Sequence, residues 1–188
     1  LGLFRLLGQP DESVLRLNRR FPGNIYSGNL PRSSRSNLWR EVGAWKKVAW
    51  MNEAEKESHE DLELLLKNVS SASVREFAAY ARRHIDLRAF ATMEALDVIF
   101  GVEEHDARQN QKFYFDPYRG RWEPMVWAMR GFRHRPELNL CETPLGLRLK
   151  LLPEYLTLRN RFILSLIDGP AGLPRLREQA VKLYRKLA

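Results

Sequence analysis

The sequence predicts an α+β fold with more helix than strand. Two observations support this class: a pair of strand-like segments in the middle of the chain, and several segments around it in which apolar residues recur at helical spacing. The 188 residues are 44% hydrophobic and 11% aromatic, which is sufficient for a folded core. No internal repeat or long linker divides the chain, so we expect a single domain over residues 1–188.

The strand-like segments predict a β-hairpin over about residues 111–127. Its two halves, 112–116 and 121–127, are rich in aromatic and β-branched residues, and Pro, Tyr, Arg and Gly form the turn between them. Alternation predicts Phe113 and Phe115 on one face and Tyr114 on the other. Since both ends of a hairpin emerge on the same side, residues just before and just after it are expected to lie close together.

Two helices are predicted between residues 55 and 84. The first, over 55–69, opens with acidic side chains, which suit a helix N-terminus, and carries leucines at helical spacing. The second begins at Ser73, which forms a capping-box pattern with Glu76.

A longer helix is predicted from an N-cap at Asp86 to a stop at Gly101. Its expected buried stripe consists of Phe90, Met93, Leu96, Asp97 and Phe100. The following loop, 102–110, is therefore attached to a buried helix, which is the kind of support that a functional site requires.

Two further helices are expected after the hairpin. Residues 133–144 show too little periodicity for an assignment. Pro153 suits the first turn of a helix that runs to Asp168 and places Tyr155, Leu158, Phe162 and Leu166 along one stripe. A Gly- and Pro-rich break then separates it from a basic helix over 175–187.

The net charge of +8, from 31 Lys and Arg against 23 Asp and Glu, attracts polyanions. The basic residues are dispersed and match no nucleic-acid-binding signature, so nucleic acid is not the expected partner.

No stretch is long and apolar enough to span a membrane. The chain has one cysteine, Cys141, which fits a reducing compartment such as the cytoplasm, and its first residues resemble no signal peptide. We therefore expect a soluble protein whose chain begins before Leu1.

The loop before the hairpin carries residues suited to phosphoryl transfer. This reaction needs a carboxylate that orients the attacking hydroxyl, and an Asn and a second carboxylate that hold magnesium on the nucleotide phosphates. Asp106 and Asn110 precede the hairpin in that order, and position 128 follows it. The alternative is that Asp106 is an ordinary loop or helix-cap residue.

The segment resembles the CotH kinase family, the spore-coat protein H relatives, which are atypical protein kinases. The resemblance rests on the Asp-x-x-x-Asn loop and on the hairpin KFYFDPYRGRWEP, and extends more weakly to ESVLRLNRRFPGNIYSG upstream and to residues 153–188. It implies a kinase-like fold with a mostly helical C-terminal lobe and an incomplete N-terminal lobe. It also implies ATP with Mg²⁺ or Mn²⁺, Asp106 as the base, Asn110 as a metal ligand, and phosphate transfer to Ser or Thr of a protein substrate, such as a coat or surface protein.

Two positions depart from the family pattern. Ala128 stands where the family has a metal-binding Asp, and Ser27 stands where many members have a Lys thought to reach the phosphates. Asp116 or Glu123 could compensate for the lost carboxylate. The sequence thus leaves three alternatives: a kinase with an altered site, a pseudokinase-like binding or scaffold module, or a basic polyanion-binding domain.

Overall fold

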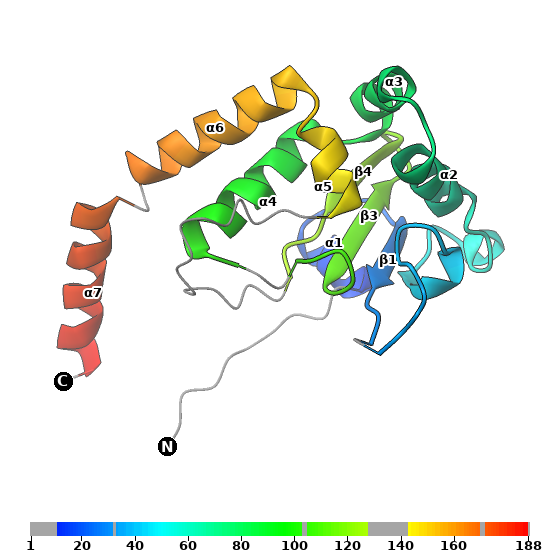
Figure 1. Ribbon diagram of the computed structural model, residues 1–188. Coiled ribbons are helices and arrows are strands. Elements are labelled where there is room, and N and C mark those ends of the chain that lie inside the picture. Colours follow the sequence, from blue (N-terminus) through cyan, green and yellow to red (C-terminus); the bar gives the residue numbers. More distant parts are fainter. Residues whose placement is uncertain (1–10, 32, 103–104, 128–142, 170–171, 188) are drawn as a thin grey trace.

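The computed structural model describes residues 11–31, 33–102, 105–127, 143–169 and 172–187, and this part of the chain is α+β, as predicted (Figure 1). The helices are α1 (Glu12–Leu17), α2 (Glu60–Ser70), α3 (Val74–His84), α4 (Leu87–Phe100), α5 (Pro144–Leu149), α6 (Pro153–Ile167) and α7 (Leu173–Leu187), with single-turn 3-10 helices η1 (Val42–Ala44) and η2 (Glu53–Glu55). The strands are β1 (Asn24–Gly28), β2 (Trp45–Ala49), β3 (Gln111–Asp116) and β4 (Arg121–Pro124).

The strands form one antiparallel sheet in the order β2-β1-β3-β4. The predicted hairpin is confirmed as β3 and β4, although β4 ends at Pro124, which cannot donate a backbone hydrogen bond to a neighbouring strand. The strands β1 and β2 were not predicted. Through them the sheet joins an N-terminal segment to the hairpin, so that Ser27 pairs with Lys46 on one side and with Lys112 on the other.

The sheet buries side chains on both faces. The larger core lies on the face that carries Phe113 and Trp122, where the sheet packs against side chains of α2, α3, α4, α5 and α6. On the opposite face Tyr114 and Ile25 pack against Leu15 of α1. The predicted separation of Phe113 from Tyr114 is therefore confirmed, and the sheet is covered by helices on both sides.

The predicted helix caps are confirmed in α3 and α4. Ser73 and Glu76 form the reciprocal capping box at the start of α3. Asp86 accepts a hydrogen bond from the backbone N–H of Ala89, and Gly101 ends α4 in the left-handed conformation. The helix expected from residue 55 begins only at Glu60, because η2 and a turn come first.

The buried face of α4 differs from the predicted stripe. Of the five residues expected there, only Phe90 and Asp97 are buried, and the helix also buries Ala91, Glu94 and Ala95. The difference arises because α6 packs along α4 and surrounds Glu94 with polar partners. A glutamate in a helix centre would otherwise indicate the solvent face.

The carboxylate of Glu94 is 1% exposed and connects α4 to α6. Its Oε2 accepts a hydrogen bond from the Tyr155 hydroxyl at 2.6 Å, and its Oε1 lies 2.8 Å from Arg159 Nε and 3.3 Å from Lys150 Nζ. These contacts compensate the desolvation of a buried charge. The prediction of α6 is confirmed from Pro153 onward, with Tyr155 buried against the core.

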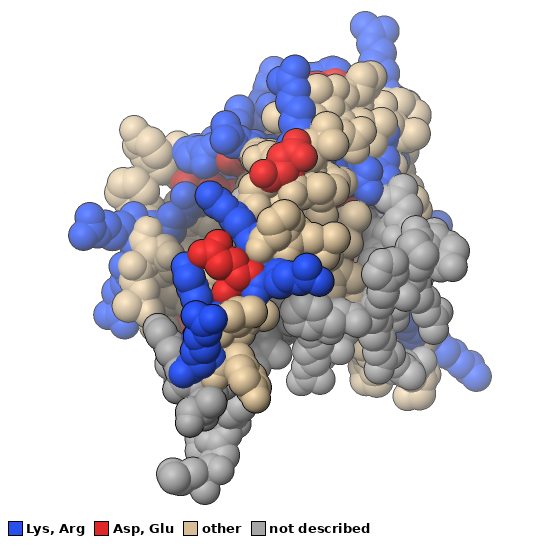
Figure 2. Space-filling view, turned by 90° about the vertical axis from the view of Figure 1, so that its left-hand side faces the viewer, with Lys and Arg blue, Asp and Glu red and all other residues tan. Residues whose placement is uncertain are grey.

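The last helix, α7, stands apart from the body of the molecule in Figure 1. Its predicted basic character is visible in the space-filling view of that side, where basic side chains predominate over acidic ones (Figure 2). A helix α5 precedes α6 and was not predicted. Thr143 caps it, and Pro144 occupies its first turn. Within the described ranges, no helix combines the length and apolarity needed to cross a bilayer.

We expect Tyr155→Phe to lower the free energy of unfolding by about 1.5–3 kcal/mol, because it removes a hydrogen bond to a buried carboxylate. Urea denaturation monitored by circular dichroism measures the loss. The matched control is Tyr184→Phe in α7. The Tyr184 side chain is 75% exposed, so this substitution should lower the free energy of unfolding by less than about 0.5 kcal/mol. Equal stabilities of the two variants would contradict a stabilising role of the Tyr155–Glu94 contact.

Candidate functional site

The loop between α4 and β3 is fixed by the buried side chain of His105. Its Nδ1 lies 2.9 and 3.0 Å from the two carboxylate oxygens of Asp97 in α4, and its Nε2 donates to the backbone carbonyl of Trp127. One imidazole therefore joins three segments: α4, the loop that contains Asp106, and the chain that leaves the hairpin. This contact confirms that the residues before and after the hairpin meet at one end.

Hydrogen-bond chemistry determines how many protons this arrangement holds. A carbonyl oxygen only accepts, so Nε2 of His105 carries a proton. The contact between Nδ1 and Asp97 requires a second proton, which lies either on the imidazole, giving an ion pair, or on the carboxyl group, giving a neutral pair. Burial raises the pKa of Asp97 above its ordinary value of 3.8, although the contact with His105 acts in the opposite direction.

Asp106, the predicted base, lies on the surface directly after this buried imidazole. Its Oδ1 accepts hydrogen bonds from the backbone N–H groups of Arg108 at 2.8 Å and Gln109 at 2.7 Å. These bonds fix the orientation of the carboxylate, and its exposure makes it accessible to a ligand. They also mean that Asp106 forms the loop turn, so both interpretations of this residue are compatible with its geometry.

The loop is also held by the N-terminal segment between β1 and β2. The backbone N–H of Leu30 donates to the Arg108 carbonyl at 2.8 Å, and the Trp39 indole N–H donates to the Ala107 carbonyl at 3.1 Å. The Arg108 guanidinium donates to the carbonyl of Ser34. Two backbone groups and the Trp39 indole, from a segment about seventy residues earlier in the sequence, thus position the loop around Asp106.

Asn110, the predicted metal ligand, has a φ of 59° and lies in the left-handed region. Asn tolerates this conformation better than most residues, and backbone strain of this kind is often found at functional sites. Asn110 ends the loop immediately before β3, so Asp106 and Asn110 belong to one short turn at the end of the hairpin. Position 128, where the family Asp is replaced by Ala128, lies outside the described residues.

The two carboxylates that could compensate for Ala128 lie elsewhere. Asp116 is at the opposite end of β3, where its Oδ1 accepts backbone hydrogen bonds of the hairpin turn. Glu123 forms ion pairs with Arg20 and Arg119. The positions of these two residues therefore give no support to the possibility that either replaces the lost carboxylate. Among the described residues, no group of three or more His, Cys, Asp and Glu side chains could hold a metal ion.

Lys112 is a site residue that the sequence did not reveal. It lies opposite Ser27 in the pairing of β3 with β1, and its Nζ is 2.7 Å from the Ser27 hydroxyl oxygen. The same ammonium lies 4.9 Å from the centre of the Trp127 ring, and burial lowers the pKa of Lys112. The position expected to carry a lysine is therefore in contact with a lysine from the neighbouring strand. Only knowledge that β1 pairs with β3 could have indicated this.

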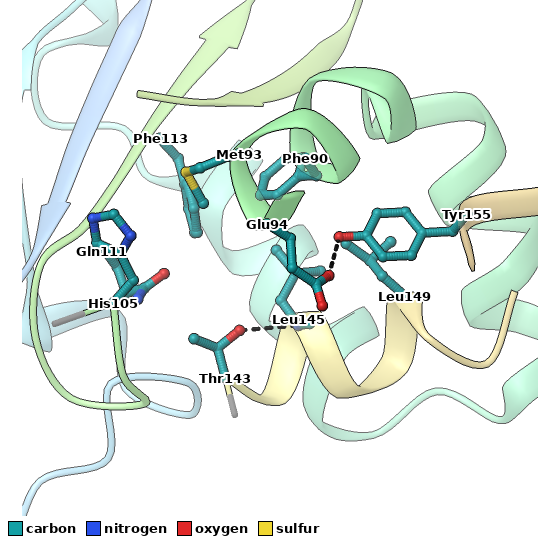
Figure 3. A pocket seen from close by; sticks show the side chains of 11 residues that line it. Phe90, Met93, Glu94, His105, Gln111, Phe113, Thr143, Leu145, Leu149 and Tyr155 are labelled. Atoms are coloured by element: carbon teal, nitrogen blue, oxygen red, sulfur yellow. Dashed lines mark hydrogen bonds between the residues drawn. The ribbon is translucent and has the colours of Figure 1, made fainter. Parts of the chain in front are cut away.

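The interior next to the loop contains a cavity between α4, β3 and α5 (Figure 3). His105 and Gln111 lie at one side of it, and Glu94 points toward Tyr155 at the other. Its volume of about 20 Å³ holds about one water molecule. This cavity is therefore too small for a nucleotide.

The arrangement predicts different effects of two substitutions at Asp97. In Asp97→Asn the amide N–H can donate to Nδ1 of a neutral imidazole, while Nε2 still donates to Trp127, so the free energy of unfolding should change by less than about 1 kcal/mol. Asp97→Ala removes the partner and should cost about 1–3 kcal/mol. Urea denaturation measures both losses, and equal losses would contradict the proposed hydrogen bonds.

Comparison of Asp97→Asn with the wild type tests the raised pKa of Asp97. In the folded wild type the carboxyl group retains a proton that the unfolded chain has already released, so its contribution to stability is lost as the pH rises through the folded-state pKa. Asp97→Asn lacks this group. We expect the variant to become more stable relative to the wild type as the pH rises above about 4, where the Asp97 carboxyl group of the unfolded chain has lost its proton, and urea denaturation over a series of pH values measures this change.

Comparison with known proteins gives a match to a protein family. No curated protein matches the chain. A family model described as CotH kinase protein matches residues 1–134, which is more than two thirds of the chain and includes the sheet, α4, the loop and the hairpin. The chain therefore belongs to the CotH kinase family, and its function is kinase-like.

Proposed function

We propose that this chain binds a nucleotide at the exposed loop beside the hairpin and acts as a CotH-type protein kinase with a weakened metal site. The proposal rests on a series of contacts that connects Asp106 to Lys112 through His105 and Trp127. His105 ties the Asp106 loop to the Trp127 carbonyl, and the Trp127 ring lies against the Lys112 ammonium. A carboxylate and a cation are thereby held near the same end of the hairpin, as phosphoryl transfer requires.

Asp106 is the group proposed to accept a proton from the attacking hydroxyl. Both backbone hydrogen bonds described for its carboxylate go to Oδ1, so Oδ2 can accept from a Ser or Thr hydroxyl of a protein substrate. The fixed orientation lowers the entropic cost of bringing base and hydroxyl together. Asn110, four residues later on the same turn, is proposed to bind Mg²⁺ or Mn²⁺ on the nucleotide phosphates.

Lys112 is proposed to contact the phosphates in place of the lysine absent at Ser27. Its ammonium is half-buried, and burial penalises the charged form, as the lowered pKa shows. A neighbouring phosphate would stabilise the ammonium and reverse this shift. The Lys112 ammonium has three N–H groups and donates one of them to the Ser27 hydroxyl. The ammonium can donate further hydrogen bonds to an anion.

The weak point of the site is the alanine at position 128. A metal bound to ATP would neutralise phosphate charge in the transition state, and the Ala128 side chain has no oxygen with which to hold it. Loss of one such stabilising group commonly costs about 3–4 kcal/mol, a hundredfold to thousandfold in rate. The same observation favours a second candidate function, in which the chain binds nucleotide or partner without phosphate transfer, as a pseudokinase does.

Restoring the carboxylate tests the site directly. We expect Ala128→Asp to strengthen Mg²⁺-dependent binding of ATP, because the introduced carboxylate and the Asn110 side chain would share the metal. In a thermal-shift titration, ligand at about a hundred times the dissociation constant should stabilise the protein by about 2.7 kcal/mol, or by about 5–10 °C. A gain of phosphate transfer in the variant would favour the kinase, and a gain of binding alone would favour the pseudokinase. An unchanged response to ATP and Mg²⁺ would reject the proposed site.

A separate test concerns the displaced lysine. Lys112→Met keeps the length and apolar part of the side chain but removes the charge, and should weaken ATP binding at least about tenfold, as expected when a hydrogen bond to a charged group is lost. Lys67→Met, at an exposed position of α2, is the control for the change in net charge. Isothermal titration calorimetry with Mg·ATP measures both. Equal affinities in the two variants would exclude Lys112 from the site.

A further inference from the structure

Helix α7 exposes an apolar stripe along its length. The stripe follows the spacing 173, 176, 180, 183 and 184, which is one face of an α-helix. Its larger members are exposed to solvent: Leu173 by 83%, Leu176 by 45%, Leu183 by 59% and Tyr184 by 75%. A helix of this kind in a folded domain normally buries the stripe against the core, yet α7 stands apart from the sheet and its covering helices (Figure 1).

The remainder of the α7 surface is basic. At about 100° per residue, Arg175, Lys182 and Arg185 lie on the side opposite the stripe, and Arg177 lies beside it. Glu178 is the acidic residue of this helix, and its carboxylate lies 2.6 Å from the Lys182 ammonium. Figure 2 shows this predominance of basic side chains. An apolar stripe flanked by basic side chains is typical of helices that lie in the interface of an anionic membrane.

We propose that α7 binds the surface of an anionic lipid bilayer, with its apolar stripe in the interface and its basic side chains against the headgroups. Charge complementarity favours this occupant over a second copy of the chain. Two stripes packed on one another would bring two basic flanks together, and each chain carries a net charge of +8. An anionic surface neutralises the same charges.

Apolar side chains are also exposed near the end of α6, the helix that precedes α7. Leu164 and Ile167 near the end of α6 are 59% and 48% exposed. A partner protein with a groove for one amphipathic helix would cover α7 alone, whereas a bilayer surface can also accommodate Leu164 and Ile167. Tyr184 adds an aromatic ring with a polar tip, a combination that is favoured at membrane interfaces.

Vesicle sedimentation with the whole chain tests the proposal. We expect the protein to bind vesicles of phosphatidylcholine that contain phosphatidylserine, and to bind those of phosphatidylcholine alone at least about tenfold more weakly. Leu183→Glu, in the stripe, should lower binding to the anionic vesicles at least about tenfold. The matched control is Leu64→Glu in α2, a leucine 48% exposed, which makes the same chemical change elsewhere and should leave binding within about twofold.

The basic face is tested separately by Arg175→Gln combined with Arg185→Gln. Each charge lost near an anionic surface is expected to weaken binding roughly fivefold, so the double variant should bind roughly thirtyfold more weakly. Circular dichroism confirms that each variant remains folded. Absence of vesicle binding, or equal losses in Leu183→Glu and Leu64→Glu, would overturn the proposal. A wild-type dimer that Leu183→Glu dissociates would overturn it in favour of self-association.

Discussion

The hydrogen bonds of His105 are the constraint on which the geometry of the site depends. Its imidazole lies between a carboxylate of α4 and a carbonyl at the end of the hairpin, and the residue that follows it is Asp106. Because both imidazole nitrogens face acceptor oxygens, the His105 imidazole and the Asp97 carboxyl group together hold two protons. These two groups therefore carry no net charge between them and can be buried. The position of the exposed carboxylate is thus set by a buried pair that itself needs no contact with a ligand.

The second constraint is the position of β1 between β2 and the hairpin. Because Ser27 lies opposite Lys112, the ammonium of a β3 side chain reaches the side chain at position 27 of β1, where the resemblance to the family led us to expect a lysine. Adjacent strands place directly opposed side chains about 5 Å apart, so a long side chain can bring its charged end to its neighbour's position. A lysine on either of two paired strands can therefore place its ammonium at nearly the same point.

The sequence predicted those elements whose signals are local. The capping box at Ser73, the cap at Asp86, the stop at Gly101 and the alternation in β3 each depend on a few consecutive residues, and all are confirmed. The strands β1 and β2 escaped prediction because they are short, and β1 buries side chains toward both covered faces, which removes the alternation of apolar and polar residues.

Predictions failed where the decisive partner is distant in sequence. Glu94 has the appearance of a surface residue, and only the packing of α6 and of the end of α5 supplies Tyr155 and Arg159 from α6 and Lys150 from the α5 C-terminus to its carboxylate. For the same reason Lys112 was not recognised, since its contact with Ser27 spans eighty-five residues. Asp106 and Asn110 were found because the loop holds both, and their chemical roles remain a proposal.

The structure separates the groups that hold the loop from the groups that would touch a nucleotide. Asp97, His105 and Gln111 are buried and hydrogen-bonded, whereas Asp106 is exposed. A substitution among the buried groups would cost stability, because it leaves a polar partner unsatisfied. Both hydrogen bonds described for the Asp106 carboxylate go to Oδ1 and form the loop turn. The buried groups and Oδ1 therefore fix the loop, and Oδ2 is the atom of this carboxylate that a ligand could contact without disturbing the turn.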